Sequence, residues 1–303
     1  MDAVKTNVSI IGVPLKYGAD RMGVEMGPDA IRSSHVHQRL EALGYQTQDI
    51  GDIPVSLQKT DTCQAGEKLK YLQEISSVNK QLCHLVADAM GQGQFPLVLG
   101  GDHSIAIGTI KGVLQHVSRL GVIWFDAHTD VNTAETTYSG NIHGMSLAVA
   151  LGYGHPDLIS IGGIDKKLRP ENVVIIGARS IDPGERPFLK DKGIRVFTMH
   201  DIDRYGMKQV MEEALQIVTA CTDGVHLSLD LDVMDPAEAP GVGTPVNGGL
   251  SYRESHLAME MLYERGVLVS AEVVEVNPMF DLQNKTARAA VELIGSVFGE
   301  RIL

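Results

Sequence analysis

Short apolar runs alternate with longer segments of helical spacing along almost the whole chain, and this alternation limits the possible folds. A short apolar run bounded by turn residues is typical of a strand that is buried on both faces of a parallel sheet. We predict such strands at Val8–Val13, Pro96–Leu99, Gly121–Phe125, Val173–Ile176, Ile194–Phe197, Val225–Leu231 and Leu268–Val276. Helices are predicted at Pro28–Leu43, Glu67–Met90, Ser104–Leu120, Pro183–Lys192, Met207–Ala220, Ser251–Arg265 and Thr286–Phe298. The pattern predicts an α/β fold of three layers, with helices on both faces of a mostly parallel sheet.

The size and composition suit one large domain. The chain has 303 residues, of which 44% are hydrophobic, and it contains no low-complexity tract, internal repeat or long linker. We therefore predict a single domain over residues 1–303 with a large core, and a long loop at Gly152–Pro170. The net charge of −12 and the lack of a Lys/Arg run argue against a nucleic-acid partner and suit a cationic substrate.

The apolar runs and the cysteines indicate a cytoplasmic protein. The first run ends at Pro14 and is about half as long as the hydrophobic region of a signal peptide. No later run approaches the roughly 18 apolar residues of a membrane span, so we expect no membrane association. Cys63, Cys83 and Cys221 are far apart and odd in number, which predicts reduced, mostly buried thiols instead of disulfides or a thiolate zinc site.

Potential metal ligands follow three of the predicted strands. Asp126–Asp130 (DAHTD) follows the apolar residues Val122–Phe125, Gly100–Ser104 (GGDHS) follows another run, and Asp230 and Asp232 end a third. Each motif alone has an ordinary reading as a turn or a solvated strand end. Because the carboxyl ends of parallel strands meet at one edge of a sheet, we predict that the three motifs converge there on metal.

The ligand types favour two divalent ions and hydrolytic chemistry. Four clustered aspartates repel one another unless cations neutralise them. Ligation by oxygen with a minority of imidazole suits Mn(II) better than Zn(II). Two such ions can lower the pKa of a shared water and create a hydroxide nucleophile at neutral pH. The chain contains neither a dinucleotide-binding glycine motif nor a phosphate-binding loop of the Walker type, which disfavours nucleotide chemistry.

These motifs resemble the ureohydrolase family, and within it the arginase group. The resemblance runs from the first strand to the C-terminus and includes Ser139–Gly144 (SGNIHG), Gly243–Pro245 (GTP) and Glu275–Pro278 (EVNP). The metal motifs are shared by all ureohydrolases, including agmatinases. The segments Asp126–Thr133 (DAHTDVNT) and Ser139–Gly144 are more specific to the arginase group.

The resemblance implies an activity and a set of site residues. The activity is hydrolysis of L-arginine to L-ornithine and urea, in which a hydroxide bridging two Mn(II) ions attacks the guanidinium carbon. Asp130 passes a proton to the leaving amine, His143 is the proton shuttle, and Glu275 binds the guanidinium. The implied metal ligands are His103, Asp126, His128, Asp130, Asp230 and Asp232.

The resemblance also implies contacts to the amino-acid end of the substrate. Asn132, Thr137, Ser139 and Asn141 match carboxylate contacts, and Asp182 and Glu185 match α-ammonium contacts. His128, Thr244 and Glu275 complete the predicted substrate-binding set. Taken singly, these polar residues are ordinary loop and helix-cap chemistry; as a set they favour arginine over agmatine, which lacks the carboxylate.

The chain departs from the family pattern in two places. Val233-Met234 stands where the family usually has Gly-Leu, and a bulkier residue beside a metal ligand can alter the loop or the metal affinity. Ser180 stands where some relatives carry an acidic residue, which can weaken ammonium contacts. His226 lies well down the strand from Asp230, so we predict a hydrogen-bonded core histidine there instead of a ligand.

Three alternatives remain open from the sequence. The nearest is another ureohydrolase, acting on agmatine or a guanidino acid. A non-catalytic metal-bearing scaffold or arginine sensor predicts the loss of a ligand, of His143 or of Glu275, and none is missing. A single-zinc deacetylase of related fold would not need the second pair of aspartates. The resemblance also implies a homo-oligomer, either a trimer or a hexamer.

Overall fold

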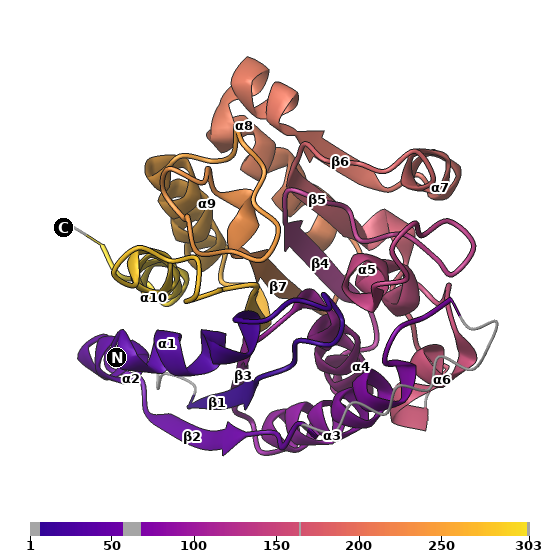
Figure 1. Ribbon diagram of the computed structural model, residues 1–303. Coiled ribbons are helices and arrows are strands. Elements are labelled where there is room, and N and C mark those ends of the chain that lie inside the picture. The colour runs from indigo at the N-terminus through magenta and orange to yellow at the C-terminus, as the bar shows by residue number, and fades with distance from the viewer. Residues whose placement is uncertain (1–6, 57–67, 164, 302–303) are drawn as a thin grey trace.

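Eight strands form one parallel sheet in the order β2-β1-β3-β8-β7-β4-β5-β6 (Figure 1). The computed structural model describes residues 7–56, 68–163 and 165–301, and the strand count refers to these residues. The strands are β1 (Val8–Val13), β2 (Thr47–Asp52), β3 (Phe95–Gly100), β4 (Leu120–Phe125), β5 (Val173–Ala178), β6 (Arg195–Thr198), β7 (Gly224–Asp230) and β8 (Leu268–Val274). The predicted α/β class is confirmed.

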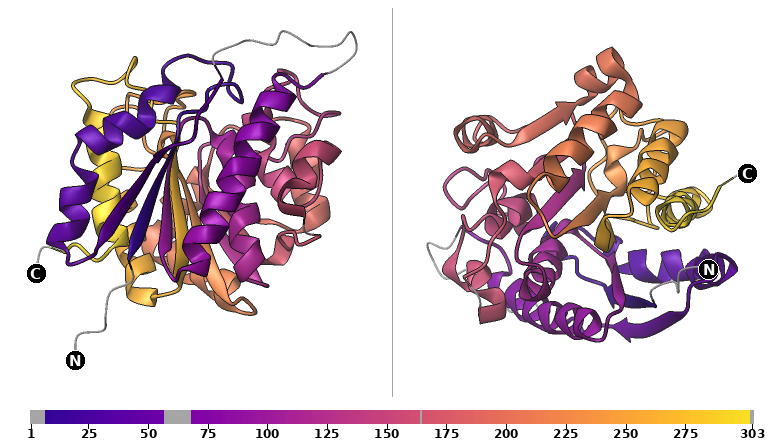
Figure 2. Two further views of the ribbon diagram at one scale, coloured as in Figure 1. Left: turned by 90° about the horizontal axis from the view of Figure 1, so that it is seen from below. Right: turned by 180° about the vertical axis from the view of Figure 1, so that it is seen from behind.

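Helices cover both faces of this sheet. They are α1 (Gly27–Ser33), α2 (Val36–Ala42), α3 (Leu72–Gly91), α4 (Ala106–His116), α5 (Ser146–Ala150), α6 (Pro156–Ile159), α7 (Glu185–Lys192), α8 (Met199–Thr219), α9 (Tyr252–Arg265) and α10 (Lys285–Val297). Figure 2 shows the sheet between α1, α2 and α10 on one side and α3 and α4 on the other. The three layers predicted from the sequence are therefore present.

Two apolar cores follow from this layering. One contains buried residues of α1, α2, α8, α9 and α10, and the other contains those of α3, α4 and α5. The side chains of a strand alternate between the two faces, so Ile10 of β1 enters the first core and Ile11 enters the second. Strands that are buried on both faces explain the continuous apolar runs of the sequence.

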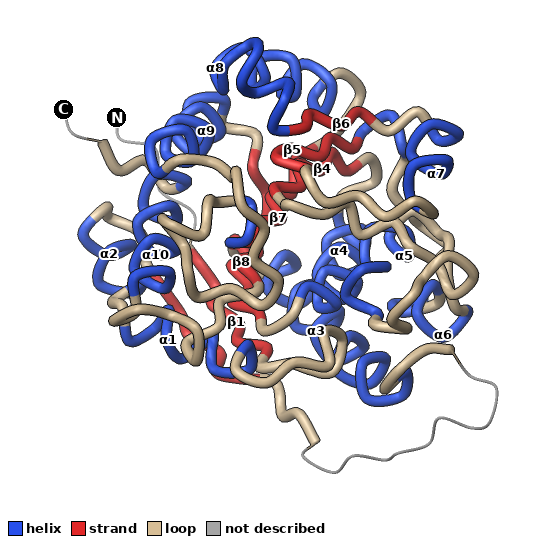
Figure 3. The backbone as a smooth tube through the Cα atoms, turned by 45° about the horizontal axis from the view of Figure 1, so that its top comes forward, coloured by secondary structure: helices blue, strands red, loops and turns tan. Residues whose placement is uncertain are grey.

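The central strands β3, β8, β7 and β4 are neighbours in the sheet. All four run in the same direction, so their carboxyl ends lie along one edge. The loops that continue from the strands surround this edge, as the tan tube in Figure 3 shows. The motifs that follow β3, β4 and β7, together with Glu275 just beyond β8, are brought to this edge.

One strand was not predicted. β2 pairs with the outer side of β1 and has the polar sequence TQDIGD, whose residues are half-buried or exposed. An edge strand needs no second buried face, so it lacks the apolar run that marks the central strands.

Several helix boundaries also differ from the prediction. The segment Pro28–Leu43 forms two helices because His35 adopts a left-handed conformation with φ 70°. Helix α8 begins at Met199, well before the predicted Met207, and a break at Gly206 (φ 77°) divides it. The predicted loop Gly152–Pro170 contains the short helix α6. The predicted helix start at Glu67 lies outside the described residues.

Neither a disulfide nor a helix that could cross a membrane occurs in the described part of the chain. None of its helices has the length and apolar character that crossing a membrane requires. Cys83 is a buried free thiol as predicted, whereas Cys221 is exposed, so the expectation of burial is wrong for Cys221. Cys63 lies outside the described residues.

Candidate metal centre

The strand ends deliver the acidic motifs through short turns. β7 ends at Asp230, and the Oδ1 atom of Asp230 accepts the backbone N–H of Asp232 (2.8 Å), which starts a 3-10 turn at Leu231–Val233. In the same way, Oδ1 of Asp126 accepts the N–H of His128 (2.7 Å) just after β4. Turns, and not the strands themselves, therefore carry Asp232 and His128 into the site.

His103 is the centre of the first group of potential ligands. Its Nδ1 atom lies 3.2 Å from one carboxylate oxygen of each of Asp126, Asp130 and Asp230. His103 is fully buried, and the three aspartates are at most 5% exposed. The imidazole also stacks on Trp124, with ring centroids 4.1 Å apart. The three strands β3, β4 and β7 thus place their ligands around one point.

A second group shares Asp126 with the first. Nδ1 of His128 lies 3.3 Å from Oδ1 of Asp126 and 3.1 Å from Oδ2 of Asp232. Two further hydrogen bonds hold Asp232, from the backbone N–H of Ala127 (3.0 Å) and from the hydroxyl of Thr244 (3.0 Å). The sets His103, Asp126, Asp230 and Asp126, His128, Asp232 each offer ligand atoms within 4.8 Å of one another.

The first group fits a cation better than it fits a proton. Nδ1 of His103 has no hydrogen-bond partner of acceptable geometry among the described residues, although three carboxylate oxygens surround it. One N–H can serve a single acceptor well. Burial and neighbouring carboxylates raise the pKa of Asp230 well above its ordinary value and that of Asp130 to about 6. A bound cation would remove this crowding of negative charge.

A cavity of about 120 Å³ opens beside the two groups. Its lining combines residues from the loops after β4 and β5 with Thr244 from the loop after β7. The lining contains the catalytic candidates Asp130 and His143, and also Gly144 and Ser180. It contains all of the predicted substrate-binding residues except Glu275: His128, Asn132, Thr137, Ser139, Asn141, Asp182, Glu185 and Thr244. Glu275 is not in this lining and lies next to it, in contact with His143.

Glu275 is fully buried, and the partly exposed His143 pairs with it. Nδ1 of His143 lies 3.0 Å from Oε1 of Glu275, and the same oxygen accepts the backbone N–H of His103 (3.0 Å). Burial opposes charge on the imidazole, but the hydrogen bond and charge of Glu275 raise the pKa of His143 to about 9. The pKa of His143 is therefore above that of a free imidazole because a buried carboxylate faces the ring.

The second carboxylate oxygen of Glu275 is free. Oε2 is buried and has no hydrogen-bond partner in the described part of the molecule. A β-carbon added at Gly243 would lie 2.3 Å from this oxygen, so glycine keeps the space beside it open. Glu275 itself has a positive φ of 64°, which shows that the backbone turns sharply where β8 has ended. A buried, unpaired carboxylate oxygen needs a donor, and a cationic ligand would provide one.

Hydrogen bonds fix the carboxylates of Asp182 and Glu185, which line the cavity. Asp182 accepts a hydrogen bond from the amide of Asn132 (3.0 Å). Glu185 accepts the backbone N–H groups of Val131 (3.0 Å) and Asp182 (2.9 Å), and burial raises its pKa to about 7. Each carboxylate oxygen has a second lone pair, so these bonds leave acceptor capacity towards the cavity.

The polar loop before α5 presents small hydrogen-bonding groups. The hydroxyl of Thr137 accepts the N–H of Gly140 (3.0 Å), and that of Ser139 accepts the N–H of Asn141 (3.2 Å). The Asn141 amide donates to the carbonyl of Ala19 (2.9 Å). The loop is thus held by its own side chains, and these side chains face the cavity.

Two residues at the site escaped the sequence reasoning. The indole N–H of Trp124 donates to Oδ2 of Asp126 (2.9 Å), and only its place in an apolar run is visible in the sequence. Arg179 donates to the backbone carbonyls of Gly177, Asp232, Val233, Met234 and Val246. This guanidinium fixes the loop that carries Asp232. The position of Arg179 next to Ser180 in a polar motif was the one signal in the sequence that could have indicated this role.

The unusual Val233-Met234 pair packs away from the cavity. Both side chains are 1% exposed and belong to the first apolar core. A β-carbon at Gly177 would lie 2.4 Å from Val233, so a glycine opposite accommodates the larger residue. His226 is a buried core histidine, as predicted, with Nδ1 2.8 Å from the hydroxyl of Ser270.

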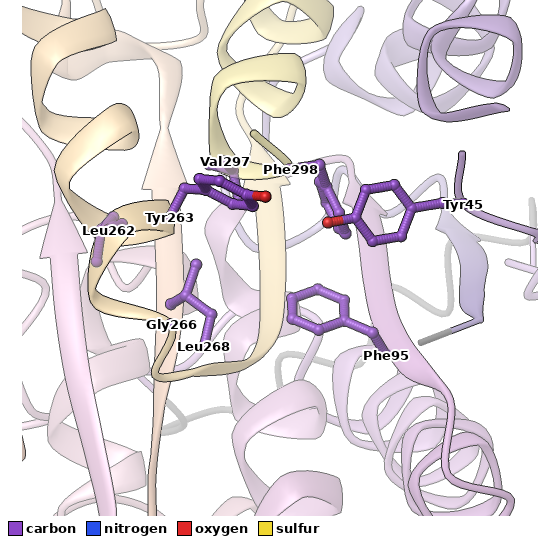
Figure 4. Close-up of a pocket in the computed structure, with 8 residues that line it drawn as sticks. All are labelled: Tyr45, Phe95, Leu262, Tyr263, Gly266, Leu268, Val297 and Phe298. Carbon is purple, nitrogen blue, oxygen red and sulfur yellow. The ribbon is translucent and has the colours of Figure 1, made fainter. Parts of the chain in front are cut away.

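A second cavity, of about 180 Å³, lies at the opposite edge of the sheet. Figure 4 shows its mainly apolar and aromatic lining, which includes Phe95 and Leu268 at the starts of β3 and β8, with Tyr45, Tyr263, Val297 and Phe298. No carboxylate or imidazole lines it. This cavity therefore lacks the carboxylates and imidazoles that gather at the carboxyl edge of the sheet.

A parallel α/β sheet with carboxylates and imidazoles paired in this way at its carboxyl edge defines the ureohydrolase class of metal-dependent hydrolases. A model of the "Arginase family" matches residues 6–299, and the chain belongs to this family. The protein is accordingly a hydrolase, which excludes the non-catalytic scaffold.

Relatives match the chain over nearly its full length. The arginase of Bacillus caldovelox is 57% identical over 98% of this chain and 99% of its own. Its native structure at pH 5.6 has a TM-score of 0.96, covering 99% of this chain and all of that one at 56% identity. The Entamoeba histolytica arginase in complex with L-ornithine has a TM-score of 0.87 at 37% identity, covering 97% and 99%.

The fold also occurs in a relative that is named as a different enzyme. The formimidoylglutamase of Bacillus subtilis has a TM-score of 0.78 at 25% identity and covers 98% of this chain and 88% of its own. Fold alone therefore does not determine the substrate, and the residues that line the cavity must be considered.

Proposed function

We propose that this protein hydrolyses L-arginine to L-ornithine and urea with two Mn(II) ions. One observation carries the proposal: at the carboxyl edge, the two ligand groups and the free oxygen of Glu275 lie beside the cavity that the polar residues for the amino-acid end line. High identity to arginases over the full chain supports the same substrate.

The ligand atoms support a pair of divalent ions. His103, Asp126, Asp130 and Asp230 would hold one ion, and Asp126, His128 and Asp232 the other, with Asp126 shared. Mostly oxygen ligands with one imidazole for each ion suit Mn(II) better than Zn(II). When bound, such ions supply a hydroxide nucleophile at neutral pH by lowering the pKa of water.

Glu275 then binds the substrate, and Asp130 and His143 transfer protons. The free Oε2 of Glu275 accepts N–H groups of the guanidinium and places its carbon near the ligand groups. Asp130 lines the cavity and transfers a proton to the leaving amine. His143, which is partly exposed, exchanges a proton with solvent. Its raised pKa keeps it ready to act as an acid at neutral pH.

The opposite end of the cavity selects an α-amino acid. Asn132, Thr137, Ser139 and Asn141 provide donors for the carboxylate, and Asp182 and Glu185 provide acceptors for the α-ammonium. His128 and Thr244 border the middle of the cavity. Ser180 also lines it and carries no charge, so two acidic side chains remain for the ammonium group.

The competing function is hydrolysis of agmatine or another guanidino compound. Agmatine retains the guanidinium and the amine but lacks the carboxylate, so the donor groups of Thr137, Ser139 and Asn141 that face the cavity would have no partner on the substrate. Unpaired polar groups in a site reject the analogue that lacks their partner. The polar loop therefore favours arginine.

A metal-reconstitution assay tests the proposal. Protein stripped of metal and reloaded with Mn(II), Zn(II) or Mg(II) is given L-arginine and agmatine in parallel, and urea is measured. We expect Mn(II) to restore urea release from arginine, with at least about 100-fold lower kcat/KM for agmatine. Failure to release urea with any divalent metal would refute the hydrolysis, and a preference for agmatine would refute the substrate.

The assembly and location are also proposals. We expect a homo-oligomer, a trimer or a hexamer, in the cytoplasm. Sedimentation analysis at micromolar concentration distinguishes these states from a monomer.

A further inference from the structure

The segment after β1 supports the polar loop that lines the cavity. The side-chain amide of Asn141 donates to the carbonyl of Ala19 (2.9 Å), and the backbone N–H of His143 donates to the carbonyl of Gly18 (3.2 Å). The amide nitrogen of Asn141 has two N–H groups, so one remains for a ligand in the cavity. The segment is itself fixed at its start, where Oδ2 of the buried Asp102 accepts the N–H of Gly18 (2.8 Å).

The segment before α3 contacts the same loop at Gly140. The backbone N–H of Lys70 donates to the carbonyl of Gly140 (3.0 Å). A β-carbon added at Gly140, which has a φ of 74°, would lie 2.2 Å from the carbonyl oxygen of Lys68. The two backbones are therefore in close contact, and a shift of residues 68–70 would displace the loop between Ser139 and Asn141.

The side chain of Asp20 joins these two supporting segments. Its Oδ2 atom accepts a hydrogen bond from Nζ of Lys70 (3.0 Å), and its Oδ1 atom accepts one from the hydroxyl of Tyr71 (3.1 Å). Asp20 directly follows the residues that hold Asn141 and His143, whereas Lys70 is the residue that holds the loop by its backbone. Both carboxylate oxygens of Asp20 thus connect the two supports of one loop.

The contribution of this contact is local. Neither Asp20 nor Lys70 lines the cavity, so neither contacts the proposed substrate. Their side chains are each 37% exposed, and an ion pair this exposed adds little to the free energy of unfolding. What the pair does control is the distance between the segments that support the cavity loop.

We propose that Asp20 and Lys70 are positioning residues for the part of the cavity that binds the α-carboxylate of the substrate. The pair ties residues 18–20 to residues 68–71 and so holds residues 139–141 in place. This inference rests on the proposed function, since the carboxylate belongs to the proposed substrate.

The arrangement predicts an effect on substrate binding instead of on the chemical step. The proton carrier His143 keeps its separate bond to the buried Glu275 when the pair is lost. The metal-ligand groups are held by the strand ends and their turns. The carboxylate end of the cavity is therefore the part that depends on Asp20 and Lys70.

The kinetics of Lys70→Met test the proposal. Methionine keeps an unbranched side chain of similar length and removes the ammonium group. In Mn(II)-loaded protein we expect the KM for L-arginine to rise about two- to fivefold, as for loss of a half-exposed ion pair, with kcat within about 1.5-fold. Calorimetry should show weaker binding of L-ornithine, which has the same amino-acid end, by a similar factor. The kcat/KM for agmatine, which lacks the carboxylate, should not change.

Two further variants separate the role of the pair from a general effect. Lys70→Arg keeps a charged donor and is expected to return the KM to within about 1.5-fold of the unaltered protein. Asp20→Asn removes the charge from the other partner, and asparagine tolerates the φ of 50° at this position. We expect Asp20→Asn to raise the KM for L-arginine as Lys70→Met does, and it replaces Lys70→Met if that variant does not fold.

Lys208→Met is the matched control. Lys208 is a surface lysine that pairs with Glu212 within α8 (3.8 Å), and no residue of α8 lines the cavity. We expect the KM and kcat of Lys208→Met to equal those of the unaltered protein.

The outcomes separate this inference from the proposed function. If the unaltered protein neither hydrolyses L-arginine nor binds L-ornithine, the proposed function fails. If it does both, and Lys70→Met and Asp20→Asn have an unchanged KM, only the inference about positioning is overturned. Equal losses with arginine and agmatine, or an equal rise in KM in Lys208→Met, would also overturn it, because they would indicate an effect that is not confined to the carboxylate end.

Discussion

Nδ1 of His143 lies 3.0 Å from Oε1 of Glu275, while Oε2 of the same carboxylate has no partner among the described residues. One oxygen of Glu275 is thus engaged by the protein and the other is left for a ligand. The pair joins β8, the last strand of the sheet along the chain, to the loop before α5. It therefore connects the guanidinium end of the cavity with the proposed proton carrier.

The free oxygen of Glu275 predicts a large effect of Glu275→Gln. The substitution removes the charge that faces the guanidinium while nearly preserving the shape of the side chain. We expect kcat/KM for L-arginine to fall about 100-fold or more, as for loss of one partner of a buried charge pair. The Mn(II) content, measured by atomic absorption, should stay unchanged. Substantial activity in this variant would show that another group binds the guanidinium.

Gly243 is predicted to be a steric requirement for the same contact. An added β-carbon would lie 2.3 Å from Oε2 of Glu275, which is too close for the carboxylate to keep its place. Because Glu275 is fully buried, it has little room to move away. We expect Gly243→Ala to reduce kcat/KM at least tenfold, about 1.4 kcal/mol of lost transition-state binding. An unchanged thermal transition would show that the effect is local.

Metal stoichiometry should distinguish His103 from Asp126. His103 belongs to one group of ligands, whereas Asp126 belongs to both. We therefore expect His103→Ala to weaken one Mn(II) ion and Asp126→Ala to weaken both. Calorimetric titration of the metal-free variants measures this difference. Identical binding curves for the two variants would contradict a shared Asp126.

The sequence predicted the central strands and the metal-ligand cluster because burial or side-chain chemistry dictates the residue types there. It did not predict the edge strand or the contacts between distant segments, which leave no such local pattern. Apolar runs such as Val8–Val13 are buried on both faces, so burial alone dictates their residue types. β2 is an edge strand and carries no such requirement. Likewise, ligands such as His103 bear their chemistry in the side chain. Trp124 and Arg179 act through contacts between distant segments, which no local pattern encodes.

The polar loop predicts a difference between two substrates. The hydroxyl of Ser139 lines the cavity at the end assigned to the carboxylate of arginine, a group that agmatine lacks. We expect Ser139→Ala to raise the KM for L-arginine about three- to tenfold, the cost of one typical hydrogen bond, because Ser139 is exposed to solvent. The small rate with agmatine should not change. A parallel rise for both substrates would place Ser139 outside the carboxylate contact.

The His143–Glu275 pair predicts a pH-dependent stability in metal-free protein. Although burial disfavours charge, Glu275 raises the pKa of His143 from about 6.5 to about 9 in the folded state. A group whose folded pKa is raised stabilises the fold fully below its unfolded pKa and loses this contribution as pH rises through the folded value. The thermal transition of the unaltered protein should therefore exceed that of His143→Asn most at pH 6, and the difference should shrink towards pH 9.5. A difference that stays constant over this range would mean that His143 is neutral throughout, and that its contact with Glu275 is an ordinary hydrogen bond.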